Sequence, residues 1–197
     1  GSNSFGSSSL DYDLVGFKYS GRATLYPLGF FAPGNELTDT DFAREKTLKL
    51  AVGGSYSYNV GVSDPIGKGH GNMNLYDKDG EKDYPDYQEI SIDLLMKYNG
   101  FTFLAEFFNA TGAGLKGLYT DPKVQLQPKG IADYLTLGNG YNFQAGYLFP
   151  CNWAVNVRYS FVTPGWSDKT VKINKAESYE AGISKYLIDN RFRIQLT

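Results

Sequence analysis

Alternation with a period of two residues runs through most of this chain and limits the folds that it can adopt. Between Trp153 and Phe161 every second residue is aromatic or β-branched, and Asn156, Arg158 and Ser160 lie among the residues between them. Because successive side chains of a β-strand point to opposite faces, this pattern predicts a strand with one apolar and one polar face. No segment has the i, i+3, i+4, i+7 spacing of apolar residues that is typical of an amphipathic helix. The sequence therefore predicts an all-β fold.

The same alternation predicts about eight strands in a single domain over residues 1–197, after a loop-like tail at 1–9. The clear strands have roughly the 9–11 residues that a tilted strand needs to cross a bilayer, whereas soluble strands are nearer 5–6 residues. The strands are expected at about 12–28, 46–58, 88–98, 100–109, 139–149, 153–163, 177–187 and 191–197.

The connections between these strands differ in length. Three are short and rich in turn-forming residues, at 99–100, 150–152 and 189–191. The connections between them are long and polar, at about 59–86, 109–139 and 163–177. Short turns at one end and long loops at the other are typical of bacterial outer-membrane barrels. The link at about 29–46 belongs to the short-turn end but is too long for a tight turn, so it is the exception.

Composition excludes several classes of protein. Mean hydropathy is −0.36, and no apolar run approaches the roughly 20 residues that a transmembrane helix needs. A net charge of −2 offers no basic excess for nucleic acid, which we do not expect as a partner. One cysteine, Cys151, excludes an intrachain disulfide.

The side chains that could carry chemistry form no catalytic or metal site that we can identify. His70 is the single histidine, which argues against a His-based triad and a multi-histidine zinc site. The run 77–83 resembles a calcium-binding loop, but its glycine is fourth where an EF-hand places it sixth, so a solvated acidic loop is favoured. Cys151 lacks a partner for nucleophilic chemistry, and Trp166 is expected to pack in a loop or at an interface. We predict no enzymatic activity, no metal and no cofactor.

The aromatic residues of the apolar face fall into two groups, one near the short turns and one near the long loops. Outer-membrane barrels carry such girdles at both lipid interfaces, whereas a soluble β-sandwich or lipocalin, which also alternates, does not predict them. We therefore expect a transmembrane, antiparallel, up-and-down β-barrel in the outer membrane of a Gram-negative bacterium, in contact with outer-membrane lipid. The interface aromatics are expected to be Tyr98, Phe101, Tyr147, Phe149 and Trp153 at the turn end, and Phe107, Tyr141, Tyr159, Phe161 and Tyr179 at the loop end.

The polar face carries nearly every strand charge; the exception, Lys185, lies near a turn from which it could snorkel. The residues expected to line a pore are Lys18, Arg22, Lys49, Lys97, Arg158 and Arg193, with Glu89, Asp93, Glu106 and Glu180. Basic rings favour anions in a pore, so one hypothesis is a weakly anion-preferring diffusion channel. The alternative is that these charges pair across neighbouring strands and only satisfy one another.

Several segments together resemble the phosphate-selective porin O and P family, in particular its Bacteroidota-type members. They are 21–29 (GRATLYPLG), 43–50 (AREKTLKL), 96–106 (MKYNGFTFLAE), 140–149 (GYNFQAGYLF), 157–159 (VRY) and 179–186 (YEAGISKY). The resemblance implies a trimeric outer-membrane porin that carries small polar or anionic solutes, with a barrel of about 16 strands. It also implies that this chain matches the C-terminal half of such a protein.

Strand number bears on function, because eight closed strands leave a lumen filled by side chains and about 16 leave an aqueous channel. Eight open strands would leave two unpaired edges in lipid, so we expect either a small complete barrel or, as we favour, further strands upstream. The predicted function is a passive diffusion porin. The alternative is a non-conducting barrel that serves as an anchor or structural subunit of a larger membrane complex, possible partners being other outer-membrane proteins.

Overall fold

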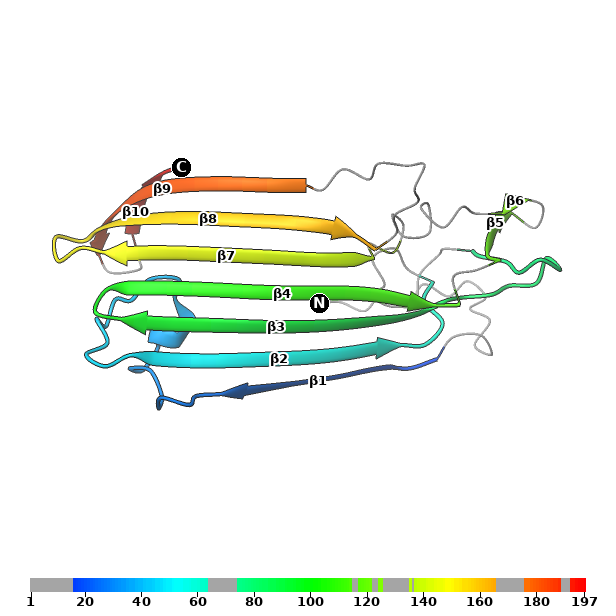
Figure 1. Ribbon diagram of the computed structural model, residues 1–197, viewed down its shortest axis with the longest axis horizontal. Helices are drawn as coiled ribbons and strands as arrows, with labels where there is room; N and C mark the ends of the chain where they lie inside the picture. Colours follow the sequence, from blue (N-terminus) through cyan, green and yellow to red (C-terminus); the bar gives the residue numbers. More distant parts are fainter. Residues whose placement is uncertain are drawn as a thin grey trace.

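The computed structural model describes residues 16–63, 74–114, 117–121, 124–125, 135, 137–165, 176–188 and 192–197. These residues form one antiparallel sheet of eight strands in which each strand pairs with the next along the chain (Figure 1). In sheet order the strands are β1 (Lys18–Leu25), β2 (Lys49–Asn59), β3 (Asp86–Tyr98), β4 (Phe101–Ala113), β7 (Gly138–Leu148), β8 (Trp153–Pro164), β9 (Ala176–Ile188) and β10 (Phe192–Leu196). The prediction of an all-β, antiparallel, up-and-down fold is confirmed.

Among the described residues, three short elements lie outside this sheet. A two-stranded sheet of β5 (Tyr119–Asp121) and β6 (Val124–Gln125) forms within the stretch that alternation leaves as a loop. One turn of 3-10 helix, η1 (Asn35–Leu37), lies between β1 and β2. None of the described helices has the length and hydropathy of a membrane span.

The sheet is open in the part of the chain that is described. There β1 pairs only with β2, and β10 only with β9, so the sheet has two free edges. The strands themselves are long, with 13 residues in each of β3, β4 and β9, because their ladders extend into the predicted loops. Figure 1 shows the β3–β4 and β7–β8 turns at one end of the sheet, together with the longer β1–β2 link, and β5 and β6 beyond the other end.

The strand register brings apolar residues of every strand onto one face. In the middle of the sheet Leu94, Ala105, Phe143, Tyr159 and Tyr179 are successive cross-strand neighbours from β3 to β9. Such cross-strand pairs, rather than backbone preference alone, stabilise a particular sheet register. This face is exposed: the accessible fraction is 56% for Val157 and 74% for Tyr179.

The aromatic residues on this apolar face contact one another at both ends of the sheet. Toward the long connections, ring centroids lie 5.0 Å apart for Phe107 and Tyr141 and 4.4 Å apart for Tyr141 and Phe161. Toward the short turns, Tyr147 and Phe149 lie 5.0 Å apart. At the same end Phe101 is the cross-strand neighbour of both Tyr98 and Tyr147. Trp153 is the cross-strand neighbour of Lys185, and the Lys185 ammonium lies over the Trp153 ring. The ten predicted interface aromatics therefore share the apolar face, in two groups.

The buried residues lie mainly on the opposite, polar face, in two small clusters. At the loop end Tyr87 and Ala110 are covered by residues of the connections, among them Val62, Leu118 and Leu135. At the turn end Leu148, Ala154 and Tyr186 form the second cluster, against which Phe42 packs. The chain therefore folds over its polar face and leaves its apolar face bare.

The turn predicted at Asn99-Gly100 is present as a two-residue hairpin. Both residues have positive φ, 47° and 88°, as a type I′ turn requires. Gly100 also has no room for a side chain, because a Cβ there would lie 2.6 Å from the carbonyl oxygen of Leu148. The turn Pro150-Cys151-Asn152 likewise has positive φ at Asn152, whereas 189–191 lies outside the described residues.

Replacing Gly100 by Ala should therefore lower the free energy of unfolding by about 1–3 kcal/mol, because it adds backbone strain and a contact with a carbonyl oxygen. The midpoint of chemical unfolding, followed by tryptophan fluorescence, measures the change. Gly21→Ala is the matched control, since nothing lies within 4 Å of a Cβ built at that position. Equal effects of the two substitutions would contradict the account of the turn.

Candidate functional site

The candidate functional site is the polar face of the sheet, where charged side chains pair with residues on other strands. Arg22 on β1 lies 2.7 Å from a carboxylate oxygen of Asp93 on β3. Its guanidinium passes over Gly53 of the intervening strand β2, where a Cβ would lie 2.4 Å from the Arg22 Nη2 atom. Glycine at position 53 thus lets the ion pair span three strands.

A second set of partners crosses β4, β7, β8 and β9. The Asn142 amide donates to Glu106 at 2.7 Å. The Arg158 guanidinium lies 3.3 Å from a Glu180 carboxylate oxygen and also donates to the Gln144 side chain at 3.2 Å. All these side chains are at least partly exposed. Two of the arginines expected to attract anions are thus already paired with carboxylates.

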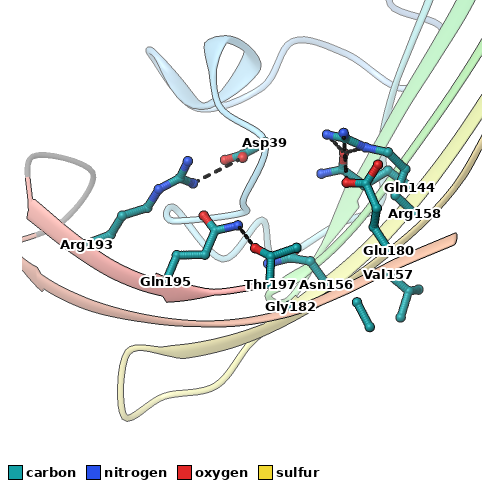
Figure 2. A pocket seen from close by; sticks show the side chains of 11 residues that line it. Asp39, Gln144, Asn156, Val157, Arg158, Glu180, Gly182, Arg193, Gln195 and Thr197 are labelled. Atoms are coloured by element: carbon teal, nitrogen blue, oxygen red, sulfur yellow. Dashed lines mark hydrogen bonds and ion pairs between the residues drawn. The ribbon is translucent and has the colours of Figure 1, made fainter. Parts of the chain in front are cut away.

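The link between β1 and β2 does not extend away from the sheet but folds back across the polar face. We call residues 29–46 the inward segment. It contacts β3 through Lys97 and β9 through Tyr186, two strands that are separated by β4, β7 and β8. Figure 2 shows the strands curving around this segment, which carries Asp39. The link that breaks the rule of short turns is therefore a structural element that covers part of the polar face of the sheet.

Lys97 anchors the inward segment to β3. Its Nζ atom lies 2.5 Å from the Asn35 carbonyl oxygen, 2.8 Å from that of Thr38 and 3.1 Å from that of Thr40, and 2.9 Å from the Thr38 hydroxyl. The side chain is completely buried. A buried ammonium is costly unless acceptors surround it, and here four oxygens do so. Lys97 lies on the predicted face, but beneath the segment, where it has no contact with solvent.

A buried network of acceptors and donors folds the segment on itself. The Asn35 side-chain amide donates to Asp41 and Glu45, at 2.8 Å in both cases. Asp41 accepts from the backbone N–H of Glu45 and, at 2.8 Å, from that of Gly100 in the β3–β4 turn. The Ala32 N–H donates to Glu45 at 2.7 Å. Each buried carboxylate therefore has partners, which fixes the segment against the turn.

The far side of the segment packs on β9. The Thr40 hydroxyl lies 3.1 Å from the Tyr186 hydroxyl, and the Phe42 and Tyr186 rings meet edge to face with centroids 4.8 Å apart. Asp39 lies 3.5 Å from a guanidinium nitrogen of Arg193 on β10. The segment therefore bridges both halves of the sheet.

The inward segment changes the charge balance of the polar face. The strands alone contribute six basic and four acidic residues among those expected to line a pore. The segment adds Arg44 and Lys46 on one side and Glu36, Asp39, Asp41 and Glu45 on the other, so that the two signs become equal. The slight basic excess seen in the strands is thus absent from the whole surface.

The remaining predicted lining residues are less engaged. Lys18 is exposed on the edge strand β1, and Glu89 is half-buried on β3. Lys49 donates to the Leu28 carbonyl oxygen at 3.3 Å. These side chains occupy the predicted face without joining a common cluster.

The residues considered for chemistry outside this face form no further site in the described ranges. In the run 77–83, Asp77 accepts from the backbone N–H groups of Asp79 and Glu81, so its carboxylate caps its own loop. Nowhere among the described residues do three His, Cys, Asp or Glu side chains gather as a metal site would need. Cys151 is exposed. His70 and Trp166 lie outside the described residues.

If Lys97 anchors the inward segment, Lys97→Met should release it, because the methionine keeps the apolar stem but leaves three carbonyl oxygens without their donor. Trypsin cleaves the segment only when it detaches locally from the sheet, so the cleavage rate follows the free energy of that detachment. If the substitution lowers this free energy by about 1.4 kcal/mol or more, cleavage after Arg44 and Lys46 should become at least tenfold faster.

Lys49→Met is the matched control, because Lys49 is the cross-strand neighbour of Lys97 and contacts a single carbonyl oxygen. Mass spectrometry of the fragments assigns the cleavage sites. Equal protection of the Lys97→Met chain and the unaltered chain would refute the anchoring role.

Comparisons of the chain with models of known protein families, with curated proteins and with solved structures find no match in any of the three. The resemblance to phosphate-selective porins is therefore still a prediction.

Proposed function

We propose that this sheet is part of an outer-membrane β-barrel that acts as a passive diffusion channel for small polar solutes. The observation that carries the proposal is the contrast between the two faces. Large apolar side chains of seven of the eight strands are exposed on one face, and those of β4 are partly exposed there. Apart from Glu177 and Lys185, which lie near the ends of β9, the charged strand side chains discussed above lie on the other face. Monomeric soluble proteins rarely expose contiguous apolar patches of more than a few hundred Å². Lipid is the environment that would cover this face, and the two aromatic groups suit its two interfaces.

The free edges support a larger barrel. Backbone N–H and C=O groups at a sheet edge cannot be left without partners in lipid. In the proposed barrel, further strands pair with β1 and β10 and close the sheet. A barrel of about 16 strands would enclose an aqueous lumen, and the polar face with its inward segment would line it.

The ion pairs favour a channel with little preference between anions and cations. Arg22, Arg158 and Arg193 each lie beside a carboxylate, and the inward segment balances the total charge. Of the two interpretations of the polar charges, mutual pairing is the one that these contacts support. We therefore propose polar solutes in general, rather than anions, as the substrates.

A second candidate function, a non-conducting anchor or structural subunit, draws support from a different observation. The polar face is covered at the turn end by the inward segment and at the loop end by the cluster around Tyr87 and Leu118. If further strands brought in similar coverings, the lumen would be blocked. Current through a planar bilayer separates the two functions, because the anchor predicts none.

The channel hypothesis predicts ohmic current across a planar bilayer and a reversal potential close to zero in a KCl gradient. Asp93→Asn should then shift the reversal potential toward that of chloride, because it leaves the Arg22 guanidinium unpaired in the lumen. Measurement of current against voltage for the two chains gives both results.

Glu177→Gln is the matched control, because it removes the same charge from the opposite face, where Glu177 is the cross-strand neighbour of Phe161. It should leave the reversal potential unchanged. The channel proposal fails if the reconstituted protein carries no current, and the pairing account fails if Asp93→Asn leaves selectivity as it was.

A further inference from the structure

One row of side chains crosses the polar face beside the tip of the inward segment and changes from apolar to charged along its length. Leu95, Leu104, Gln144, Arg158 and Glu180 are cross-strand neighbours on β3, β4, β7, β8 and β9. With strands about 4.8 Å apart, the row extends roughly 19 Å. Its first two residues are apolar exceptions on a polar face.

The tip of the inward segment, residues 37–39, lies over this row, and a groove forms between the tip and the sheet. At the leucine end of the row, Leu37 and Thr38 of the segment enclose a cavity of about 210 Å³ with Leu95, Leu104 and Thr102, and Glu36 also lines it. Asp39 and Gln144 line this cavity and also the next, of about 110 Å³, which the charged residues surround. Because the two cavities share these residues, they form one groove at the lower end of the size of small-molecule sites.

The charged end of the groove offers both signs to a solute. Arg158 lies 3.3 Å from Glu180, and Arg193 lies 3.5 Å from Asp39. Figure 2 shows these two pairs on two sides of the same pocket. The four side chains are between 41% and 49% exposed, so each can contact a bound molecule. A simple anion is poorly suited, because a carboxylate stands beside each guanidinium; a carboxylate and an ammonium on one molecule would match both.

The apolar end contains two groups that lack partners in the structure. The Leu37 side chain is 84% exposed, although it faces a cavity with two further leucines. The Thr102 hydroxyl, in a residue that is only 4% exposed, has no hydrogen-bond partner among the described residues. Buried polar groups are normally paired, so an unpaired one on the wall of a cavity indicates a missing partner. A solute with an apolar side chain and an amide would supply both contacts.

We propose that this groove is a binding subsite for short zwitterionic peptides with apolar side chains, of the dipeptide class. The peptide places its termini between the two ion pairs, an apolar side chain against Leu37, Leu95 and Leu104, and its amide near the Thr102 hydroxyl. A role for this subsite in the passage of peptides through a pore rests on the proposed channel function. Binding of a peptide to the subsite can be measured without any current.

The test is equilibrium dialysis of radiolabelled leucyl-leucine against the full chain reconstituted in lipid vesicles. Two competitors divide the recognition: glycyl-glycine keeps the charges without the side chains, and N-acetyl-leucyl-leucine amide keeps the side chains without the charges. Leucyl-leucine should bind about tenfold more tightly than either competitor. Glycyl-glycine loses the burial of leucine side chains, and the capped peptide loses the contacts of its charges, and each loss weakens binding by about that factor or more.

Substitutions at each end of the groove locate the site. Arg158→Gln and Leu104→Ala should each weaken binding about tenfold, whereas Arg22→Gln should leave it within about twofold. Arg22 is the matched control, because it belongs to an ion pair on the same face but does not line the groove. Equal affinity for all three peptides, or an equal loss with Arg22→Gln, would overturn the proposal.

The outcome also separates this inference from the channel. Binding of leucyl-leucine without bilayer current would keep the subsite and reject the channel. Current without such binding would keep the channel and reject the subsite.

Discussion

The antiparallel hydrogen-bond ladder is the constraint on which the rest of this structure depends. Side chains alternate between faces with a period of two, so an unbroken register fixes the face of every residue. In the described strands of the eight-stranded sheet the register shifts once, between Phe192 and Arg193 on β10. The apolar face, the ion pairs and the row from Leu95 to Glu180 all follow from this continuity.

The inward segment gives the polar face its particular shape. The segment is held at Lys97, at the β3–β4 turn and at Tyr186, so it projects Leu37 and Asp39 above the sheet from a fixed base. Its carboxylates also offset the basic residues of the strands. Both the charge balance and the groove therefore arise from a segment of the chain that is not a strand of the sheet.

Local pattern predicts the sheet but not the segment. Alternation and the Asn99-Gly100 pair are patterns of residues close together in the sequence. They are enough to predict the order of the strands and the hairpin between β3 and β4. The contacts of the segment join residues 59 positions apart at Lys97 and Thr38, and 146 apart at Thr40 and Tyr186, which no periodicity records. One signal was nevertheless present: Leu95, Leu104, Leu148 and Tyr186 interrupt the polar face, and the structure places all four beside the segment.

The central claim is that the apolar face meets lipid and the polar face meets water. Nitroxide labels placed one at a time along β8, with Cys151 replaced by Ser, test it most directly. In lipid vesicles, collisions with oxygen should dominate at 155, 157, 159 and 161, and collisions with a water-soluble nickel complex at 156, 158 and 160, because alternate residues face opposite sides. Uniform access of the nickel complex to all seven positions would contradict the account.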